Sequence, residues 1–102
     1  MKTKIAVGCD HRGFDYKEKL KTFLKEKGYD VIDCGTFSTE SADYPDFIFA
    51  AAEKVGKGEC AWGIGICHSG IGSVIAANKV KGVRAALCQS LEEAKLSRQH
   101  NN

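Results

Sequence analysis

Short apolar runs alternate along this chain with segments of helical periodicity, and this alternation limits the available folds more than any other feature. The run over residues 4–8 is β-branched and ends at a glycine, whereas residues 15–27 carry apolar side chains at helical spacing from Tyr16 to Leu24. Parallel strands need a crossover connection, which is usually a helix and is right-handed. The alternation therefore predicts a three-layer, Rossmann-like α/β domain with a parallel sheet and helices on both faces.

The sequence predicts four strands, four helices and a polar loop over 35–43. The expected strands are 4–8, 29–34, 62–67 and 83–88. The expected helices are 15–27, 45 to about 56–58, 73–79 and 90 to about 99. Gly28 stands where a left-handed helix cap is wanted, and Ser90 can cap the last helix. With the strand order 2-1-3-4, the order reverses between the first and third strands.

Composition excludes several classes of protein. With 102 residues, 43% of them hydrophobic, the chain forms one domain that can bury roughly two thirds of its unfolded surface without disulfides or a structural metal. The 15 basic and 13 acidic residues are scattered, so we expect no nucleic-acid partner. No apolar stretch approaches the roughly 18 residues of a membrane span, and we expect neither membrane association nor a signal peptide. Five cysteines without a C-x-x-C spacing predict reduced thiols and a cytoplasmic location.

Two polar, glycine-marked loops follow the first and third expected strands. They are Cys9–Gly13 and Cys67–Gly72, and ligands of open α/β sheets bind where such loops meet at a reversal of strand order. Neither loop has a nucleotide-binding fingerprint. Gly70 and Gly72 precede a helix, where bare backbone N–H groups and the helix dipole favour an anion. The alternative is a tight strand-to-helix turn that needs glycine for its backbone.

Cys67 ends the third strand beside this expected anion site, where a helix N-terminus would stabilise a thiolate. It could serve as a base or a nucleophile. The alternative is that it packs as a small buried hydrophobe, which is the role we assign to the other cysteines, Cys9, Cys34, Cys60 and Cys88. Asp10 and His11 could form an acid/base and anion-binding pair, or a helix-capping Asp beside a solvated His. By itself, His100 would be a surface residue at a helix end, with Asn101 as a routine cap.

Five motifs together suggest a family. They are Gly8-Cys9-Asp10-His11, Ser41-Ala42-Asp43-Tyr44-Pro45-Asp46, Gly65 to Gly72, Ile75-Ala76-Ala77-Asn78-Lys79 and Ser97-Arg98-Gln99-His100-Asn101. In this order and spacing they resemble type B ribose-5-phosphate isomerases, whose wider family includes galactose-6-phosphate and allose-6-phosphate isomerases. The resemblance spans almost the whole chain. It implies interconversion of ribose 5-phosphate and ribulose 5-phosphate through an enediolate, without a metal or organic cofactor.

The resemblance also implies roles for individual residues. Cys67 would be the catalytic base, His100 would open the furanose ring, and Asp10 would hold the sugar hydroxyls. Three further side chains would bind substrate or line its pocket: His11, Tyr44 and Asn101. The backbone of one loop would hold the enediolate oxygens and sugar hydroxyls, and this loop consists of His68, Ser69, Gly70, Ile71 and Gly72.

The chain departs from the family pattern in two places, at His68 and at its C-terminal end, and it differs from a sister branch at Ser73. His68 stands where the family usually has Gly, which adds an imidazole beside Cys67. Ser73 occupies the position where a sister branch has a Glu, so the thiolate would be the base. The family continues beyond Asn102 with a strand, a long terminal helix and phosphate-gripping arginines. We therefore expect 1–102 to be a single sugar-phosphate isomerase domain that lacks the C-terminal strand and helix.

The direction of the last expected helix implies a shared site. The helix over about 91–99 runs ~13 Å from the carboxyl edge of the sheet toward the opposite edge, at 1.5 Å per residue. His100 would then reach the pocket of a neighbouring subunit, in a homodimer or a dimer of dimers with shared active sites. Two alternatives to the pentose phosphate isomerase stay open: a hexose-6-phosphate isomerase and a noncatalytic sugar-phosphate-binding module. A thiol redox protein is disfavoured because no resolving Cys lies within a few residues of Cys67.

Overall fold

Three parallel strands form the sheet, in the order β2-β1-β3. The computed structural model describes residues 2–37, 40 and 44–101, without the side chains of 44, 45 and 101. Its strands are β1 (Lys4–Cys9), β2 (Asp30–Asp33) and β3 (Trp62–Ile66). Its helices are η1 (His11–Gly13), α1 (Phe14–Glu26), α2 (Tyr44–Gly56), α3 (Ile71–Asn78) and α4 (Leu91–Asn101). The parallel sheet and its strand order confirm the expected α/β fold for these three strands.

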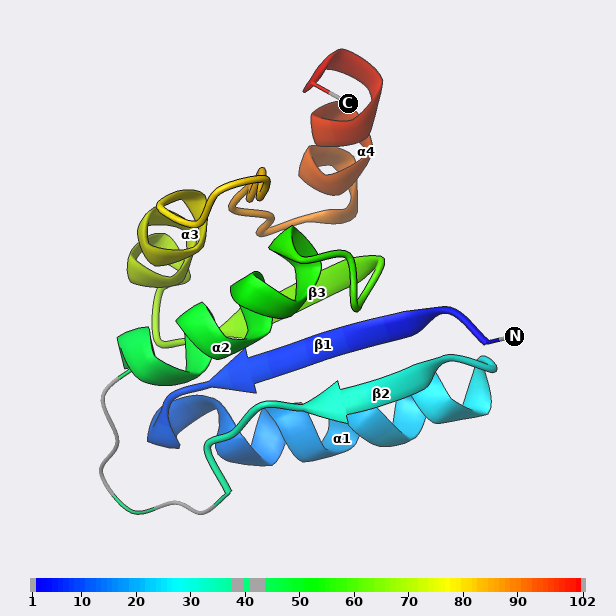
Figure 1. Cartoon of the computed structure of the whole chain (residues 1–102), viewed down its shortest axis with the longest axis vertical. Coiled ribbons are helices and arrows are strands. Elements are labelled where there is room, and N and C mark those ends of the chain that lie inside the picture. Colours follow the sequence, from blue (N-terminus) through cyan, green and yellow to red (C-terminus); the bar gives the residue numbers. More distant parts are fainter. Residues whose placement is uncertain (1, 38–39, 41–43, 102) are drawn as a thin grey trace.

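The central strand β1 separates two apolar layers because its side chains alternate between the faces of the sheet. Ile5 and Val7 pack with Leu24 of α1. Ala6 packs on the other face, with Ala51 of α2 and with Cys60. Helices α1 and α2 therefore cover opposite faces, as Figure 1 shows. This arrangement is the predicted three-layer architecture.

A small residue in β1 brings α2 close to the carboxyl end of the sheet. A β-carbon added at Gly8 would lie 2.4 Å from the backbone oxygen of Phe47 in α2. Any side chain at Gly8 would therefore push the helix away from the sheet. The glycine holds α2 beside the edge at which β1 and β3 end.

The two predicted helix caps are present, one after α1 and one before α4. Gly28 follows α1 with φ of 92°, the left-handed conformation expected for a residue that ends a helix. The Ser90 hydroxyl accepts a hydrogen bond from the Glu93 N–H at 3.1 Å and begins α4. The polar loop expected over 35–43 lies partly outside the described residues, at 38–39 and 41–43.

The fourth strand predicted over 83–88 is wrong, because this segment has no regular secondary structure. The side-chain amide of Asn78 donates to the Ala85 carbonyl at 2.9 Å and accepts from the Ala85 N–H at 2.8 Å. These are the two backbone groups with which Ala85 would pair in a sheet. This mostly apolar run was predicted to be a strand, but the partner of the Ala85 backbone is a side chain and not β3.

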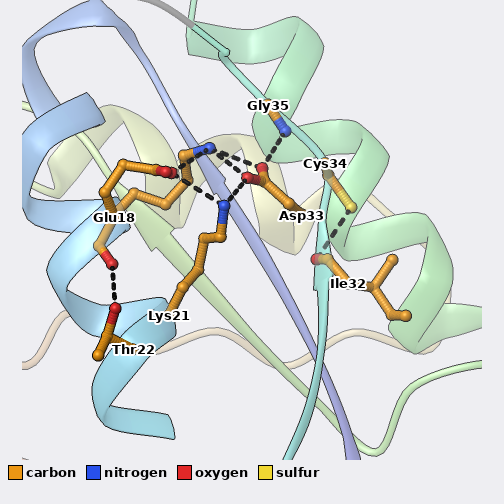
Figure 2. A network of polar contacts seen from close by, with 8 residues as sticks. Glu18, Lys21, Thr22, Ile32, Asp33, Cys34 and Gly35 are labelled. Atoms are coloured by element: carbon orange, nitrogen blue, oxygen red, sulfur yellow. Dashed lines mark hydrogen bonds and ion pairs between the residues drawn. The ribbon is translucent and has the colours of Figure 1, made fainter. Parts of the chain in front are cut away.

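A buried ion pair that the sequence pattern did not predict joins α1 to the end of β2. The Lys17 side chain is fully buried, and its Nζ lies 2.6 and 2.7 Å from the two carboxylate oxygens of Asp33. Lys21 adds a second contact to Asp33 at 2.7 Å, and the Gly35 N–H adds a third at 2.9 Å. Figure 2 shows Glu18 and Lys21 reaching from α1 toward Asp33. The pair fixes the end of β2 against the helix.

Within the described ranges, no helix is long and apolar enough to cross a membrane. The longest helices, α1 and α2, have 13 residues each. A membrane-spanning helix needs about 20.

Candidate active site

The loops after β1 and β3 begin side by side at the carboxyl edge of the sheet. The two strands pair up to Cys9 and Ile66, and the Asp10 N–H donates to the Ile66 carbonyl at 3.2 Å. Asp10 and Cys67 therefore leave the sheet next to each other. The meeting of the two polar loops at the switch point confirms what the strand order predicted.

Cys67 lies in a nest of hydrogen-bond donors at the start of α3. The Gly70 N–H donates to the Cys67 sulfur over 3.2 Å. Burial raises the pKa of Cys67, but the Ser73 hydroxyl and the backbone N–H groups of Ser73, Gly70 and Ser69 outweigh it. The net effect is a lowered pKa for Cys67. The thiol is thereby prepared to ionise, as a base or nucleophile requires.

Gly70 confirms the tight-turn interpretation of its loop, and the anion-binding interpretation stays a prediction. Its φ of 84° lies in the left-handed region, so the turn requires glycine for its backbone. A β-carbon there would also lie 2.5 Å from Cδ1 of Leu87. The same conformation aims the Gly70 N–H at Cys67, so the tight turn itself creates the anion-stabilising donor.

The other cysteines differ from Cys67 in their environment. Burial is the largest influence on Cys9, Cys34 and Cys60, and it raises the pKa of each thiol. Cys9 and Cys60 are buried, as the packing role predicted. Cys88 is exposed, so the packing role assigned to it is wrong. The reason is that the segment over 83–88 does not pair as a strand and leaves this thiol at the surface.

Asp10 caps a helix, which was the alternative to a role in acid/base chemistry. It is 7% exposed, and its Oδ1 accepts from the Gly13 N–H at 2.9 Å, which begins the short helix η1. His11 is the first residue of η1 and is half-buried. Both residues lie on the loop beside Cys67, where the sequence placed them. The cap fixes this loop against the end of β1.

The loop from His68 to Gly72 follows Cys67 and is mostly at the surface. His68 and Ser69 are exposed, and the Ser69 hydroxyl accepts from the Ile71 N–H at 3.2 Å. Ile71 is 53% exposed. Two surface hollows lie elsewhere, one along α4 and one at the amino edge of the sheet. Cys67 lines neither of them.

His100 lies away from Cys67 within the chain. The guanidinium of Arg98 stacks on the ring of Trp62 at 4.5 Å, which anchors α4 beside the amino end of β3. Cys67 follows the opposite end of that strand. His100 is exposed near the end of α4, and Figure 1 shows this end of the helix apart from the connection between β3 and α3.

For two further residues predicted to lie in the site, the structure describes the backbone but not the side chain. Tyr44 begins α2 and Asn101 ends α4, and the described side chains include neither. The motif residues Ser41, Ala42 and Asp43 lie outside the described residues. Among the residues that the structure describes, no group of three or more His, Cys, Asp or Glu side chains could hold a metal ion.

Ser73 contributes to the site in a way that the sequence did not predict. The resemblance implies only that it stands where a sister branch has a Glu. The structure places it in the first turn of α3, 5% exposed, and its hydroxyl and backbone N–H lower the pKa of Cys67. The sequence shows a polar residue at the third position of a helix of small residues. Its closeness to the site became visible only from the packing of α3 against β3.

Comparisons with known proteins agree with this arrangement. A model of the Ribose/Galactose Isomerase family matches residues 5–102. Ribose-5-phosphate isomerase B of Escherichia coli is 50% identical over 99 residues, which are 97% of this chain and 66% of that protein. Galactose-6-phosphate isomerase subunit LacB of Clostridium acetobutylicum is 45% identical over 98 residues, 96% of this chain and 57% of that protein. The chain therefore spans about two thirds or less of these relatives.

Solved structures are similar over nearly the whole chain. Ribose-5-phosphate isomerase B of Clostridium thermocellum superposes with a TM-score of 0.94 and 52% identity, covering 97% of this chain and 67% of that one. The type B enzyme of Trypanosoma brucei gives a TM-score of 0.93 and 44% identity, covering 99% and 69%. The sheet, its helices and the loop that carries Cys67 thus belong to one common architecture.

Proposed function

Because this chain belongs to the ribose/galactose isomerase family, we propose that it interconverts ribose 5-phosphate and ribulose 5-phosphate with Cys67 as the base. The observation that carries the proposal is the nest of donors around the Cys67 sulfur, which lowers the pKa of the thiol. An ordinary thiol, with a pKa of about 8.5, is only slightly ionised at neutral pH. The nest increases the fraction present as thiolate.

The reaction needs one carbon-bound proton to move between adjacent carbons. The Cys67 thiolate removes the proton from C2 of the open-chain aldose, and the electron pair moves into the C1 carbonyl to form an enediolate. The resulting thiol returns the proton to C1, while a proton passes between the two sugar oxygens, which completes the ketose. General-base catalysis of this kind contributes about 10² to 10⁴ in rate. No metal or organic cofactor is needed for these steps.

The remaining site residues receive proposed roles. Backbone N–H groups of the loop from His68 to Gly72 stabilise the enediolate oxygens, and each such donor contributes about 2.7 to 4 kcal/mol in measured cases. Asp10 and His11 hold sugar hydroxyls. Tyr44 and Asn101 line the pocket, and His100 opens the furanose ring by proton transfer.

Solvent deuterium exchange tests the proposal. The protein is incubated with ribose 5-phosphate in D₂O, and deuterium at the carbon next to the carbonyl is followed by NMR together with ribulose 5-phosphate formation. An isomerase incorporates deuterium, whereas a noncatalytic sugar-phosphate-binding module binds the sugar without exchange. Binding without exchange or product would contradict the proposal.

A hexose 6-phosphate is the second candidate substrate, because the galactose-6-phosphate isomerase subunit is 45% identical to this chain. The exchange experiment repeated with galactose 6-phosphate separates the two sugars. We expect the pentose to give the higher kcat/KM. A higher value for the hexose would reassign the substrate and leave the proposed chemistry unchanged.

Assembly follows from the position of His100. Since Arg98 anchors α4 beside the amino end of β3, His100 does not reach Cys67 of its own chain. We propose a homodimer or a dimer of dimers in which His100 of one subunit completes the site of the other.

Mixing two inactive variants is expected to restore activity. Hybrid dimers of Cys67→Ala and His100→Ala chains contain one site with both residues intact and one site with neither. After subunit exchange, verified by mass spectrometry, random mixing should give about a quarter of the wild-type activity, because half of the dimers are hybrids with one of two sites intact. Each variant alone is the control. Hybrid dimers without activity would contradict the shared site.

The cellular setting that we propose is the cytoplasm. All five cysteines are free in the structure, which is typical of proteins in a reducing compartment. A pentose phosphate isomerase there would serve carbohydrate metabolism, in the pentose phosphate pathway.

A further inference from the structure

The Ser73 hydroxyl is buried beside Cys67 without a hydrogen-bond partner. Ser73 is 5% exposed, and its Oγ forms no hydrogen bond within the described part of the chain. Native proteins leave few buried polar groups unpaired, because each one loses its hydrogen bonds to water. An alanine would fill the same position without this loss. We therefore expect the Ser73 hydroxyl to form a hydrogen bond in another state of the protein.

The surroundings of Ser73 point to the Cys67 sulfur as that partner. Ser73 lies in the first turn of α3 and packs over β3, where a β-carbon added at Gly65 would lie 3.6 Å from the Ser73 Cβ. Burial raises the pKa of Cys67, and the Ser73 hydroxyl is the strongest of the influences that lower it. Ser73 follows Gly70, whose N–H donates to the sulfur, by about one helical turn, and it packs over Gly65, two residues before Cys67 in the chain. Its hydroxyl makes no hydrogen bond in this position.

We propose that Ser73 is a positioning residue whose hydroxyl donates a hydrogen bond to the Cys67 thiolate and holds it toward the substrate. The proposal rests on the proposed function, in which this thiolate is the base. The Gly70 N–H, at 3.2 Å from the sulfur, is a fixed donor because the turn sets its direction. The Ser73 hydroxyl can rotate, so it can turn toward the sulfur when the thiol ionises and relax when the sulfur takes the substrate proton.

The expected consequence is a change in the ionisation of Cys67. Loss of the Ser73 hydroxyl removes one hydrogen bond from the thiolate and none from the neutral thiol, so the pKa of Cys67 rises. A hydrogen bond to a charged group corresponds to a shift of about one pH unit. The acidic limb of the kcat/KM profile moves to higher pH by the same amount, because the base is then protonated over a wider range.

The test measures the Cys67 thiol without substrate. In a Cys88→Ser background, which removes the exposed thiol, the rate of alkylation by iodoacetamide is followed against pH. Burial raises the pKa of the other three thiols, so Cys67 ionises first. Ser73→Ala should shift the profile up by about one unit, and Ser73→Thr, which keeps a hydroxyl, should restore it.

Ser69→Ala is the matched control for the thiol profile. Its hydroxyl lies on the same loop but accepts from the Ile71 N–H, so its loss should leave the alkylation profile in place. Ser73→Ala should keep the wild-type Tm, because the hydroxyl has no structural hydrogen bond to lose. An unshifted profile in Ser73→Ala, an equal shift in Ser69→Ala, or a Ser73→Ala chain that does not fold would overturn the proposal.

The result is independent of the isomerase assay. A shifted alkylation profile supports the role of Ser73 at the thiol whether or not the substrate has been identified correctly. Absence of deuterium exchange in the wild-type protein would instead refute the proposed function. The two failures are therefore distinguishable, because one is read on the thiol alone and the other on the sugar.

Discussion

Replacing Cys67 with alanine is expected to abolish isomerisation and solvent deuterium exchange while the fold stays intact. The substitution removes the only group proposed to accept the carbon-bound proton, and it removes little volume from a half-buried position. Loss of a general base alone lowers the rate by about 10² to 10⁴. The measurement is kcat for ribose 5-phosphate together with deuterium incorporation, with circular dichroism to verify folding.

Two other cysteines provide the control for Cys67. Cys34→Ala and Cys60→Ala should keep their activity and lose only packing, about 1 to 3 kcal/mol of unfolding free energy. Equal activity in Cys67→Ala and the wild type would refute the proposed mechanism.

The Cys67 mechanism also predicts the acidic side of the rate profile. The pKa of Cys67 is lowered by the Ser73 hydroxyl and the backbone donors, against the effect of burial. Below this pKa the sulfur is protonated and cannot accept the substrate proton, so kcat/KM should fall as the pH falls through it. The fall should begin below the ordinary thiol pKa of about 8.5. If kcat/KM already falls at or above the ordinary thiol pKa, the hydrogen-bond donors do not lower the pKa of Cys67.

Breaking the ion pair between Lys17 and Asp33 is expected to have the largest effect on stability. Asp33→Asn keeps the shape of the side chain but removes the charge that faces the fully buried ammonium of Lys17. Leaving a buried charge without its partner typically costs about 3 to 5 kcal/mol. Glu18 reduces this cost, because its carboxylate also lies 3.5 Å from the Lys17 Nζ. Urea unfolding of the variant and the wild type measures the difference.

The exposed pair between Lys54 and Glu59 is the matched control. Its Nζ and Oε2 lie 3.3 Å apart, but both side chains are solvated, so Glu59→Gln should leave the unfolding free energy unchanged. A similar loss in both variants would show that burial does not distinguish the two pairs.

The same ion pair predicts a loss of stability in acid. Partial burial raises the pKa of Asp33, but hydrogen bonds from Lys17, Lys21 and the Gly35 N–H hold it below its ordinary range. A lowered folded-state pKa contributes stability above the unfolded value of about 3.9, and this contribution is lost as the pH falls through the folded value. The difference between the wild type and Asp33→Asn should therefore be constant near neutral pH and shrink in acid. A difference independent of pH down to the acid transition would contradict this account.

Much of the candidate site could be predicted from the sequence because it depends on local signals and chain connectivity. Strand-helix alternation implies a parallel sheet, and parallel strands bring their carboxyl ends to one edge. With the assumed order, in which β1 and β3 are neighbours, the loops that begin at Asp10 and Cys67 meet there. The turn at Gly70 followed from glycine's freedom to adopt a positive φ, and the start of α4 followed from the capping hydroxyl of Ser90. The roles of individual residues came from the resemblance of five motifs.

The sequence by itself therefore determined the alternation of strands and helices from β1 to α3 and the edge at which Cys67 lies, whereas the strand order was an assumption that the structure bears out for β2-β1-β3. Only the tertiary structure decided that Asn78 and not β3 pairs with Ala85, and that Lys17 is buried against Asp33. These outcomes depend on contacts between residues far apart in the chain or on the competition between a side chain and a strand for the same backbone groups. Periodicity and propensity describe one segment at a time, and they contain no information about which distant group will be its partner.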